Sequence, residues 1–381
     1  ARTMNPQRFI AQRIAGLSAS GIRRIFDLAA SMHDPIDFSM GQPDFPVPEA
    51  IKRAAAEAVA SDHNGYTVTH GIPELRERIR QGLQAEYGWE VTDPDWTVFV
   101  TCGVSGALTL IMLACLDPGD EVIVPDPYFV SYPHLVTLAA GVPVPVDTAP
   151  DFVFDPVRLE RAVTARTKAV VLASPSNPTG VVYSADQVRA VCDFAKAHDL
   201  LVISDEIYNE LSFDGRPASP ADIVPERTIL LRGFGKTYAV TGWRMGYVAG
   251  PAAIVNEMAK LQQYTFVCAP HPLQRACLAA FDVDMTDVIE AYRRKCALGA
   301  GMLAERFEFP NPRGGFYYYC RAPERFAGGT AFVEAAIAKN VLTVPGSAFS
   351  AHDTHFRISY AVADEKLRAG CEILNALADG A

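Results

Sequence analysis

Several features that would mark other protein classes are missing from this chain of 381 residues. It has no run of 18 apolar residues and no apolar signal segment at its start, so we expect neither a membrane span nor secretion. Its eight cysteines include no CxxC pair, which favours buried, reduced thiols over a redox motif or a zinc site. The sequence therefore predicts a cytoplasmic protein with no membrane partner and no metal site.

Positive charge is also scarce. The chain has 34 Lys and Arg residues against 44 Asp and Glu residues, which gives a net charge of −10. That balance disfavours a nucleic-acid partner and an anionic membrane surface. We expect any anionic substrate to be held by a few local arginine or lysine side chains.

The segment RGFGKT (232–237) is similar to a nucleotide-binding loop but lacks the spacing of one. A P-loop needs a glycine six residues before Lys236, and the chain has Leu230 there. The pattern GxGxxG fails as well, because Lys-Thr-Tyr follows Gly235. The glycines can instead let a ligand approach the backbone closely.

From residue 92 onward, short apolar runs alternate with helical stretches such as 105–116, 184–198 and 252–263. Short buried runs between helices predict an α/β domain with a mostly parallel, seven-stranded sheet between helices. The runs are 97–101, 121–124, 142–146, 169–173, 200–204, 228–231 and 245–249.

The rest of the chain divides into an N-terminal arm and a smaller C-terminal unit. The arm includes a helix around 22–32, and it leads into an extended, proline-rich segment at 40–48 and a helix at 48–61. The C-terminal part alternates helices with strands at 315–320 and 356–361, which predicts an α+β domain. The predicted division is an arm that also forms part of the small domain (1–40), a large domain (41–281) and a small domain (282–381).

In an open α/β sheet, ligands bind beyond the carboxyl ends of the strands. The candidate site residues are therefore the polar ones that follow the apolar runs. They occur in TCGVSG (101–106), SNPTG (176–180), DEIY (205–208) and RGFGKT (232–237).

Two of these residues have a structural interpretation beside the functional one. Lys236 follows a buried strand, and it is either a surface lysine or a desolvated amine able to form a Schiff base. Asp205 ends an apolar strand and needs a partner, which could be a protonated pyridine nitrogen, an arginine or a metal.

Three further candidates are equally open when each is taken alone. The turn at 103–105 is either an ordinary helix cap or an anion site made by the N–H groups of Gly103, Val104 and Ser105. Asn177 could serve only as a turn former, and Arg244 could offer a phosphate its fork of donors. Their joint occurrence near strand ends favours a shared site.

Together these motifs resemble the fold-type I, class I and II aminotransferases of the aspartate aminotransferase superfamily. The resemblance extends over nearly the whole chain, from GQPDF at residue 41 to FRISYA. Its strongest segment is GKTYAVTGWRMGY (235–247), and the other matching segments are YTVTHGIPELR (66–76), PDPYFVSY (125–132), NPTG (177–180) and DEIY (205–208). The resemblance implies the fold of these transferases and a pyridoxal 5′-phosphate cofactor.

The resemblance also implies catalytic roles. Lys236 carries the cofactor as a Schiff base and moves the proton during the reaction. Asp205 pairs with the pyridine nitrogen and keeps it protonated, so that the ring can accept electrons. Asn177 and Tyr208 hydrogen-bond the ring oxygen, and Phe129 stacks on the ring.

The remaining implied roles concern the phosphate and the substrate. Arg244 and the turn formed by Gly103, Val104 and Ser105 hold the phosphate, and Tyr66 reaches the phosphate in the neighbouring subunit of a homodimer. Arg357 binds the substrate α-carboxylate, with Gly41 and Asn177 beside it.

Two departures from the family pattern concern the phosphate and the substrate. A phosphate-contacting serine is common three residues before the lysine, and here that position is Gly233. Members specific for dicarboxylates often carry an arginine about thirty residues after the lysine, but none occurs between Arg244 and Arg275. The resemblance therefore leaves the amino donor open.

The implied activity is ping-pong transamination between an L-amino acid and a 2-oxo acid, in amino-acid metabolism. A β-lyase, a decarboxylase or another carbanion chemistry on the same fold is the alternative. A transcription regulator with an aminotransferase-like domain is a remote alternative, because GQPDF begins at residue 41 and we expect no DNA-binding domain before it.

Overall fold

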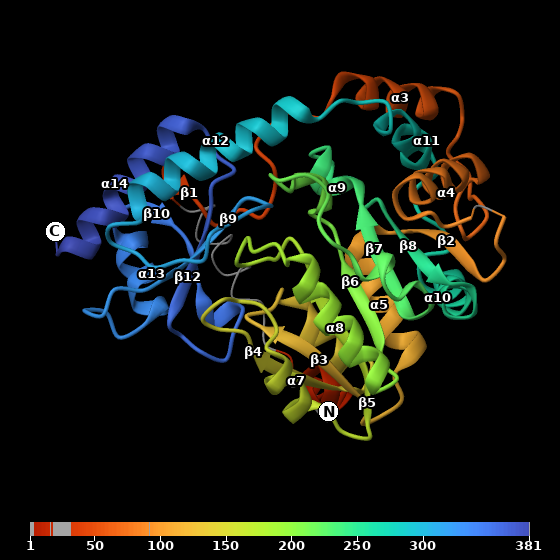
Figure 1. Cartoon of the computed structure of the whole chain (residues 1–381). Coiled ribbons are helices and arrows are strands. Elements are labelled where there is room, and N and C mark those ends of the chain that lie inside the picture. Colours follow the sequence, from red (N-terminus) through yellow and green to blue (C-terminus); the bar gives the residue numbers. More distant parts are fainter. Residues whose placement is uncertain (1–3, 16, 18–31, 91, 381) are drawn as a thin grey trace.

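A sheet of seven strands forms the centre of the molecule in the computed structural model, which describes residues 4–15, 17, 32–90 and 92–380. The spatial order of the strands is β2-β8-β7-β6-β5-β3-β4 (Figure 1). All neighbours are parallel except β8, which is antiparallel to both β2 and β7. The strands are β2 (Trp96–Thr101), β3 (Glu121–Asp126), β4 (Val142–Asp147), β5 (Thr167–Ala173), β6 (Leu201–Asp205), β7 (Thr228–Gly233) and β8 (Gly246–Pro251).

The sheet confirms the prediction of a mostly parallel α/β fold. Each of the seven apolar runs forms a strand, and the bounds differ from the predicted ones by two residues at most, as at the end of β8. Apolar side chains point to both faces, so Val122 and Val124 lie in one core cluster and Ile123 in another. Strands buried on both faces need apolar residues at every position, which explains the continuous runs.

Helices cover both faces of the sheet (Figure 1). On one face lie α5 (Gly103–Cys115), α6 (Ser131–Leu138) and α10 (Ala252–Thr265). On the other lie α7 (Pro156–Ala162) and α8 (Ala185–Ala197). Near β2 and β8, that second face is covered by α3 (Glu49–Ala60), α4 (Pro73–Tyr87) and α11 (His271–Ala280).

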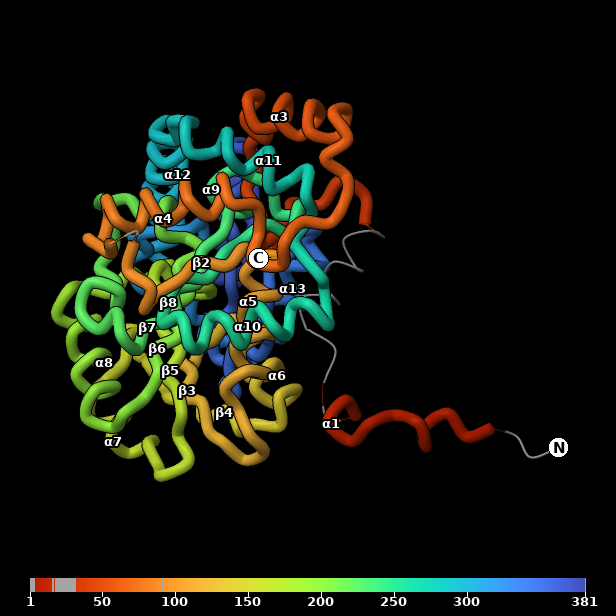
Figure 2. The backbone as a smooth tube through the Cα atoms, turned by 90° about the vertical axis from the view of Figure 1, so that its right-hand side faces the viewer, coloured from red at the N-terminus to blue at the C-terminus, as the bar shows by residue number. Residues whose placement is uncertain are grey.

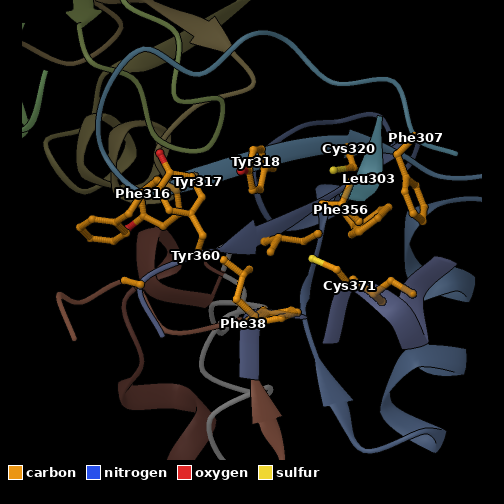
Figure 3. Packing of buried hydrophobic residues seen from close by; sticks show 14 of the residues in the cluster. Phe38, Leu303, Phe307, Phe316, Tyr317, Tyr318, Cys320, Phe356, Tyr360 and Cys371 are labelled. Carbon is orange, nitrogen blue, oxygen red and sulfur yellow. The ribbon is translucent and has the colours of Figure 1, made fainter. Parts of the chain in front are cut away.

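The C-terminal part of the chain forms a smaller α+β unit around its own aromatic core (Figure 3). An antiparallel sheet of order β11-β12-β9 packs beside three helices, and β10 pairs in parallel with β1 from the N-terminal part. The elements are β1 (Ile36–Asp37), α12 (Thr286–Leu303), β9 (Tyr317–Arg321), α13 (Gly329–Ala338), β10 (Val341–Leu342), β11 (Val344–Pro345), β12 (His355–Ser359) and α14 (Asp364–Asp379). The division at residues 40 and 281 stays a prediction.

The N-terminal residues 4–15 lie beside the main body as an extension (Figure 2). They contain a 3₁₀ turn (Pro6–Phe9) and the short helix α1 (Gln12–Ala15), and neither has a buried residue. Phe9, Ile10 and Ile14 are exposed apolar side chains on this extension. The helix expected around 22–32 falls almost entirely outside the described residues.

The carboxyl ends of the parallel strands bring the predicted site residues together. Asp205 is the last residue of β6, and α9 (Phe234–Thr237), which contains Lys236, follows β7 directly. The antiparallel strand β8 begins where its neighbours end, because Gly246 pairs with both Thr101 and Gly233. Arg244 precedes that start, so it lies at the same edge of the sheet.

Behind this edge, Arg232 forms a buried ion-pair network. Its guanidinium donates to both carboxylate oxygens of Glu86 at 2.6 and 2.7 Å and to Glu206 at 2.8 Å. Ser204 donates to the other carboxylate oxygen of Glu206 at 2.9 Å. Glu206 follows Asp205 in the chain, so this network fixes the backbone that carries Asp205.

We predict that Arg232→Met destabilises the protein by about 3–5 kcal/mol, because Glu206 and Glu86 lose their buried cation. Urea denaturation measures the change. The control is Lys52→Met, which removes an exposed pair with Glu49 and should change stability by about 1 kcal/mol or less. Equal effects of the two substitutions would contradict a stabilising role for the network.

Candidate active site

A cavity of about 290 Å³ lies at the carboxyl edge of the seven-stranded sheet. Met40, Gly41 and Gln42 form part of its wall, and Tyr317 and Arg357 reach it from the three-stranded sheet. All the predicted site residues except Tyr66 line it, namely Gly41, Gly103, Val104, Ser105, Phe129, Asn177, Asp205, Tyr208, Lys236, Arg244 and Arg357.

Lys236 places its amine inside this cavity. The amine donates a hydrogen bond to the backbone carbonyl of Gly41. Burial, together with the nearby positive charges of Arg357 and Arg244, lowers the pKa of Lys236 to about 8. At pH 7.4 roughly a fifth of this amine is therefore neutral, against roughly 0.1% for an exposed lysine.

Asp205 provides a buried carboxylate on the floor of the cavity. It accepts hydrogen bonds from the Tyr132 hydroxyl at 2.6 Å and from the backbone N–H of Ile207 at 3.2 Å. Burial raises the pKa of Asp205, and the two donors oppose that rise. Such a carboxylate can hold a proton on a basic nitrogen that faces it.

A cradle for an anion forms where α5 begins. Gly103 has a φ of +73°, and a Cβ at this position would lie 2.7 Å from a nitrogen of the Arg244 guanidinium. Only glycine therefore lets the guanidinium lie against the first turn of the helix. The free N–H groups of that turn and the guanidinium create a positive potential that fits a phosphate.

Arg357 supplies a second anion site. It is only 1% exposed, and it donates to the Asn177 side-chain oxygen at 2.9 Å and to the Ser39 carbonyl at 2.8 Å. The guanidinium carbon lies 4.5 Å from the ring centre of Tyr317 and 4.7 Å from that of Phe349. Because these partners are neutral or aromatic, the positive charge remains available to a ligand that enters in the guanidinium plane.

Tyr132 and Tyr317 are among the cavity residues that the sequence interpretation missed. Tyr132 holds Asp205, and Tyr317 contacts Arg357 and lies with its hydroxyl 2.9 Å from that of Tyr208. Tyr132 lies inside a segment that matches the family and follows Phe129 by three residues, a spacing that places both on one side of a helix start. No comparable signal marks Tyr317, whose position depends on strand pairing.

Tyr66 lies outside the cavity and is 84% exposed. Its neighbour Thr67 donates a backbone N–H to the sulfur of Cys268 at 3.5 Å, which joins this segment to the one around residue 266. Several other large apolar side chains on the two segments are exposed, namely Val68, Tyr264, Phe266 and Val267. The role of Tyr66 across a subunit interface stays a prediction.

Among the described residues, no group of histidine, cysteine and acidic side chains is placed to hold a metal ion. None of the described helices is long and apolar enough to span a membrane.

Comparison with known proteins identifies the family. The model for aminotransferase class I and II matches residues 33–374. The chain belongs to this family. A probable aspartate/prephenate aminotransferase of Thermus aquaticus is 39% identical over 96% of this chain and 98% of the relative. An aromatic-amino-acid aminotransferase of Thermococcus litoralis is 35% identical over 94% of this chain and 95% of the relative.

Solved structures show the same fold. The aspartate aminotransferase of Thermus thermophilus with maleate superposes with a TM-score of 0.89 at 36% identity, over 96% of this chain and 98% of the other. The enzyme of Thermotoga maritima gives a TM-score of 0.92 at 31% identity, over 97% of this chain and 100% of the other. The chain is an aminotransferase, as predicted, and none of these relatives is named as a lyase.

The pKa of Lys236 can be tested in the protein without cofactor. We predict that reductive methylation of Lys236 by formaldehyde, followed by mass spectrometry, reaches half of its maximal rate near pH 8. Below that pH the amine is protonated and unreactive, and above it the amine is neutral. Arg357→Gln should raise the midpoint, because it removes a nearby positive charge. A midpoint near the ordinary value of 10.5 in the wild type would contradict the account.

Proposed function

We propose that this aminotransferase binds pyridoxal 5′-phosphate in the cavity and moves the amino group of an L-amino acid to a 2-oxo acid by a ping-pong mechanism. One observation carries the proposal. A lysine amine with a pKa of about 8, a buried carboxylate and an arginine with only neutral partners face the same cavity. These groups suit a carbonyl carbon, a protonated ring nitrogen and a carboxylate, respectively.

The cavity residues fit each part of the cofactor. Arg244 and the turn formed by Gly103, Val104 and Ser105 suit the phosphate, as their uncompensated positive potential indicates. Phe129 would stack on the ring. Asp205 would hold the ring nitrogen, while Asn177 and Tyr208 would bond the ring oxygen. The phosphate serine expected three residues before Lys236 is Gly233, so the backbone turn and Arg244 carry more of that contact.

When bound, pyridoxal 5′-phosphate supplies a carbonyl for amines and a ring that accepts electrons from the substrate Cα. Lys236 is the residue whose amine would hold that carbonyl carbon at rest. When its amine is free and neutral, Lys236 would be the base that takes the proton from the substrate Cα and returns it on the product side.

Asp205 and Tyr208 support this proton transfer from two directions. The Asp205 carboxylate, whose ionised form the donors Tyr132 and Ile207 favour, would hold the proton on the ring nitrogen. Each pKa unit by which it favours that proton is worth about 1.4 kcal/mol. Tyr208 is 3% exposed, and burial keeps its hydroxyl protonated as a donor because it raises the pKa of Tyr208.

Substrate orientation falls to Arg357. Its fork would bind the α-carboxylate at two points, with the Asn177 side chain and the Gly41 backbone beside it. This contact would orient the amino acid within the cavity that also contains the Lys236 amine. The amino donor and the preferred side chain remain open.

A homodimer with shared active sites is also part of the proposal. The exposed apolar side chains of Tyr66, Val68, Tyr264, Phe266 and Val267 lie on neighbouring segments near the phosphate cradle. An exposed patch of this kind is typical of a subunit interface. The extension at 4–15 carries further exposed apolar side chains. A second copy would cover these surfaces and bring its Tyr66 to the phosphate.

We also propose a cytoplasmic location. All eight cysteines are free, and five of them are buried. Free, buried thiols are typical of proteins from a reducing compartment.

The activity is tested by measuring 2-oxo acid formation from a panel of L-amino acids, with and without a 2-oxo acid acceptor. Transamination predicts one equivalent of product per site without acceptor and many turnovers with it. Lys236→Ala should lower the rate by a factor of about 10² to 10⁴ or more. Lys260→Ala, which alters an exposed lysine, should leave the rate unchanged. Many turnovers without an acceptor would indicate a lyase and overturn the proposal.

A further inference from the structure

Tyr317 lies between the two halves of the active site. Its ring centre is 4.5 Å from the guanidinium carbon of Arg357, and its hydroxyl is 2.9 Å from the hydroxyl of Tyr208. The side chain is completely buried. One residue thus contacts both the proposed carboxylate site and a proposed cofactor ligand.

Strand pairing explains why the ring of Tyr317 meets Arg357. In the antiparallel pair of β9 and β12, Tyr317 is opposite Ser359, and Tyr319 is opposite Arg357. Side chains two residues apart on a strand share a face, so Tyr317 and Arg357 are diagonal neighbours on one face of the sheet. Tyr318, between Tyr317 and Tyr319 on β9, directs its side chain to the other face, where its hydroxyl donates to the Cys296 carbonyl of α12.

The ring of Tyr317 restricts how Arg357 can bind. Phe349 lies 4.7 Å from the same guanidinium carbon, so two aromatic rings flank the group. Asn177 and Ser39 each accept one of its N–H groups. The rings and these two acceptors hold the fork in one orientation before a substrate arrives, which favours binding of a carboxylate in the guanidinium plane.

The hydroxyl of Tyr317 has a separate role. A tyrosine hydroxyl has a single hydrogen to donate. If Tyr208 donates that hydrogen to the ring oxygen of the cofactor, its own oxygen is left to accept from Tyr317. Burial raises the pKa of both hydroxyls, so both stay protonated. Tyr317 then donates a hydrogen bond to Tyr208, and Tyr208 donates one to the cofactor. Each of these two hydrogen bonds strengthens the other.

We propose that Tyr317 is a positioning residue for both the carboxylate site and the cofactor site. Its ring fixes Arg357 for the α-carboxylate, and its hydroxyl directs the proton of Tyr208 toward the cofactor ring oxygen. This inference rests on the proposed function, since it assumes the ligands assigned to Arg357 and Tyr208. The two ends of one side chain therefore control two different quantities, substrate binding and cofactor chemistry.

Two substitutions distinguish the role of the Tyr317 ring from that of its hydroxyl. Tyr317→Phe keeps the ring and removes the hydroxyl, so we expect kcat to fall about tenfold and the KM for the amino acid to stay within about twofold, because Arg357 keeps its stacking partner. Tyr317→Leu removes both, so kcat falls and KM also rises about tenfold. Phe349→Leu removes only the opposite ring and should raise KM without lowering kcat.

Binding measurements test the separate roles of the ring and the hydroxyl without catalytic turnover. Propionate has a carboxylate but no amino group, so its dissociation constant from the holoenzyme, measured by calorimetry, reports on Arg357. It should be unchanged in Tyr317→Phe and raised about tenfold in Tyr317→Leu. The dissociation constant of the cofactor should rise in Tyr317→Phe, because the chain to the ring oxygen is broken.

The neighbouring residue provides a matched control. Tyr318 is also completely buried, and its hydroxyl donates to the Cys296 carbonyl outside the cavity. Tyr318→Phe also removes a buried hydroxyl, yet it should leave kcat, KM and both dissociation constants unchanged. Melting temperatures of all variants reveal any loss that comes from folding alone.

Two outcomes would overturn the inference. The first is a Tyr317→Phe enzyme with wild-type kcat and cofactor affinity, and the second is a Tyr317→Leu enzyme with wild-type propionate affinity. If the wild type itself fails to transaminate any amino acid, the proposed function fails, and the propionate and cofactor affinities still decide the role of Tyr317.

Discussion

The chemistry of this site depends on the burial of one lysine amine beside two guanidinium groups. Burial disfavours the charged form of Lys236, and the nearby positive charges of Arg357 and Arg244 in the same cavity add to that effect. Together they lower the pKa of Lys236 to about 8. The same arrangement therefore creates an amine that loses its proton more readily than an exposed lysine, with an anion site on either side of it. This suits the proposed amino-acid substrate and phosphate-bearing cofactor.

The scaffold explains how these charges are held close together. Parallel strands end at one edge, so Asp205 and Lys236 meet there although thirty positions separate them in the chain. Arg357 comes from the separate antiparallel sheet and reaches Asn177 beyond β5. Behind the edge, Arg232 pairs with Glu206, the neighbour of Asp205 in the chain. The seven-stranded sheet thus fixes Asp205 and Lys236. The proposed carboxylate site depends instead on Arg357 and the residues that orient it.

Much of the fold and of the site could be predicted from the sequence. The seven apolar runs became the seven strands, and the polar residues beyond them became the cavity wall, because buried strands and strand-end residues carry strong local signals. The reversal of β8 carried no such signal, since its apolar run reads alike in either direction. Tyr132 and Tyr317 act through partners that are distant in sequence, and the register of β9 against β12 decides which tyrosine of 317–319 faces Arg357. Contacts of that kind depend on pairing in three dimensions, which a single sequence does not display.

The central claim is that Lys236 is the residue to which the cofactor is bonded. Borohydride reduction of the purified holoenzyme, followed by digestion and peptide mass spectrometry, tests it most directly. The account predicts a reduced pyridoxyl phosphate group on the peptide that contains Lys236, with none on the other lysine peptides. A modified lysine elsewhere and an unmodified Lys236 would contradict it.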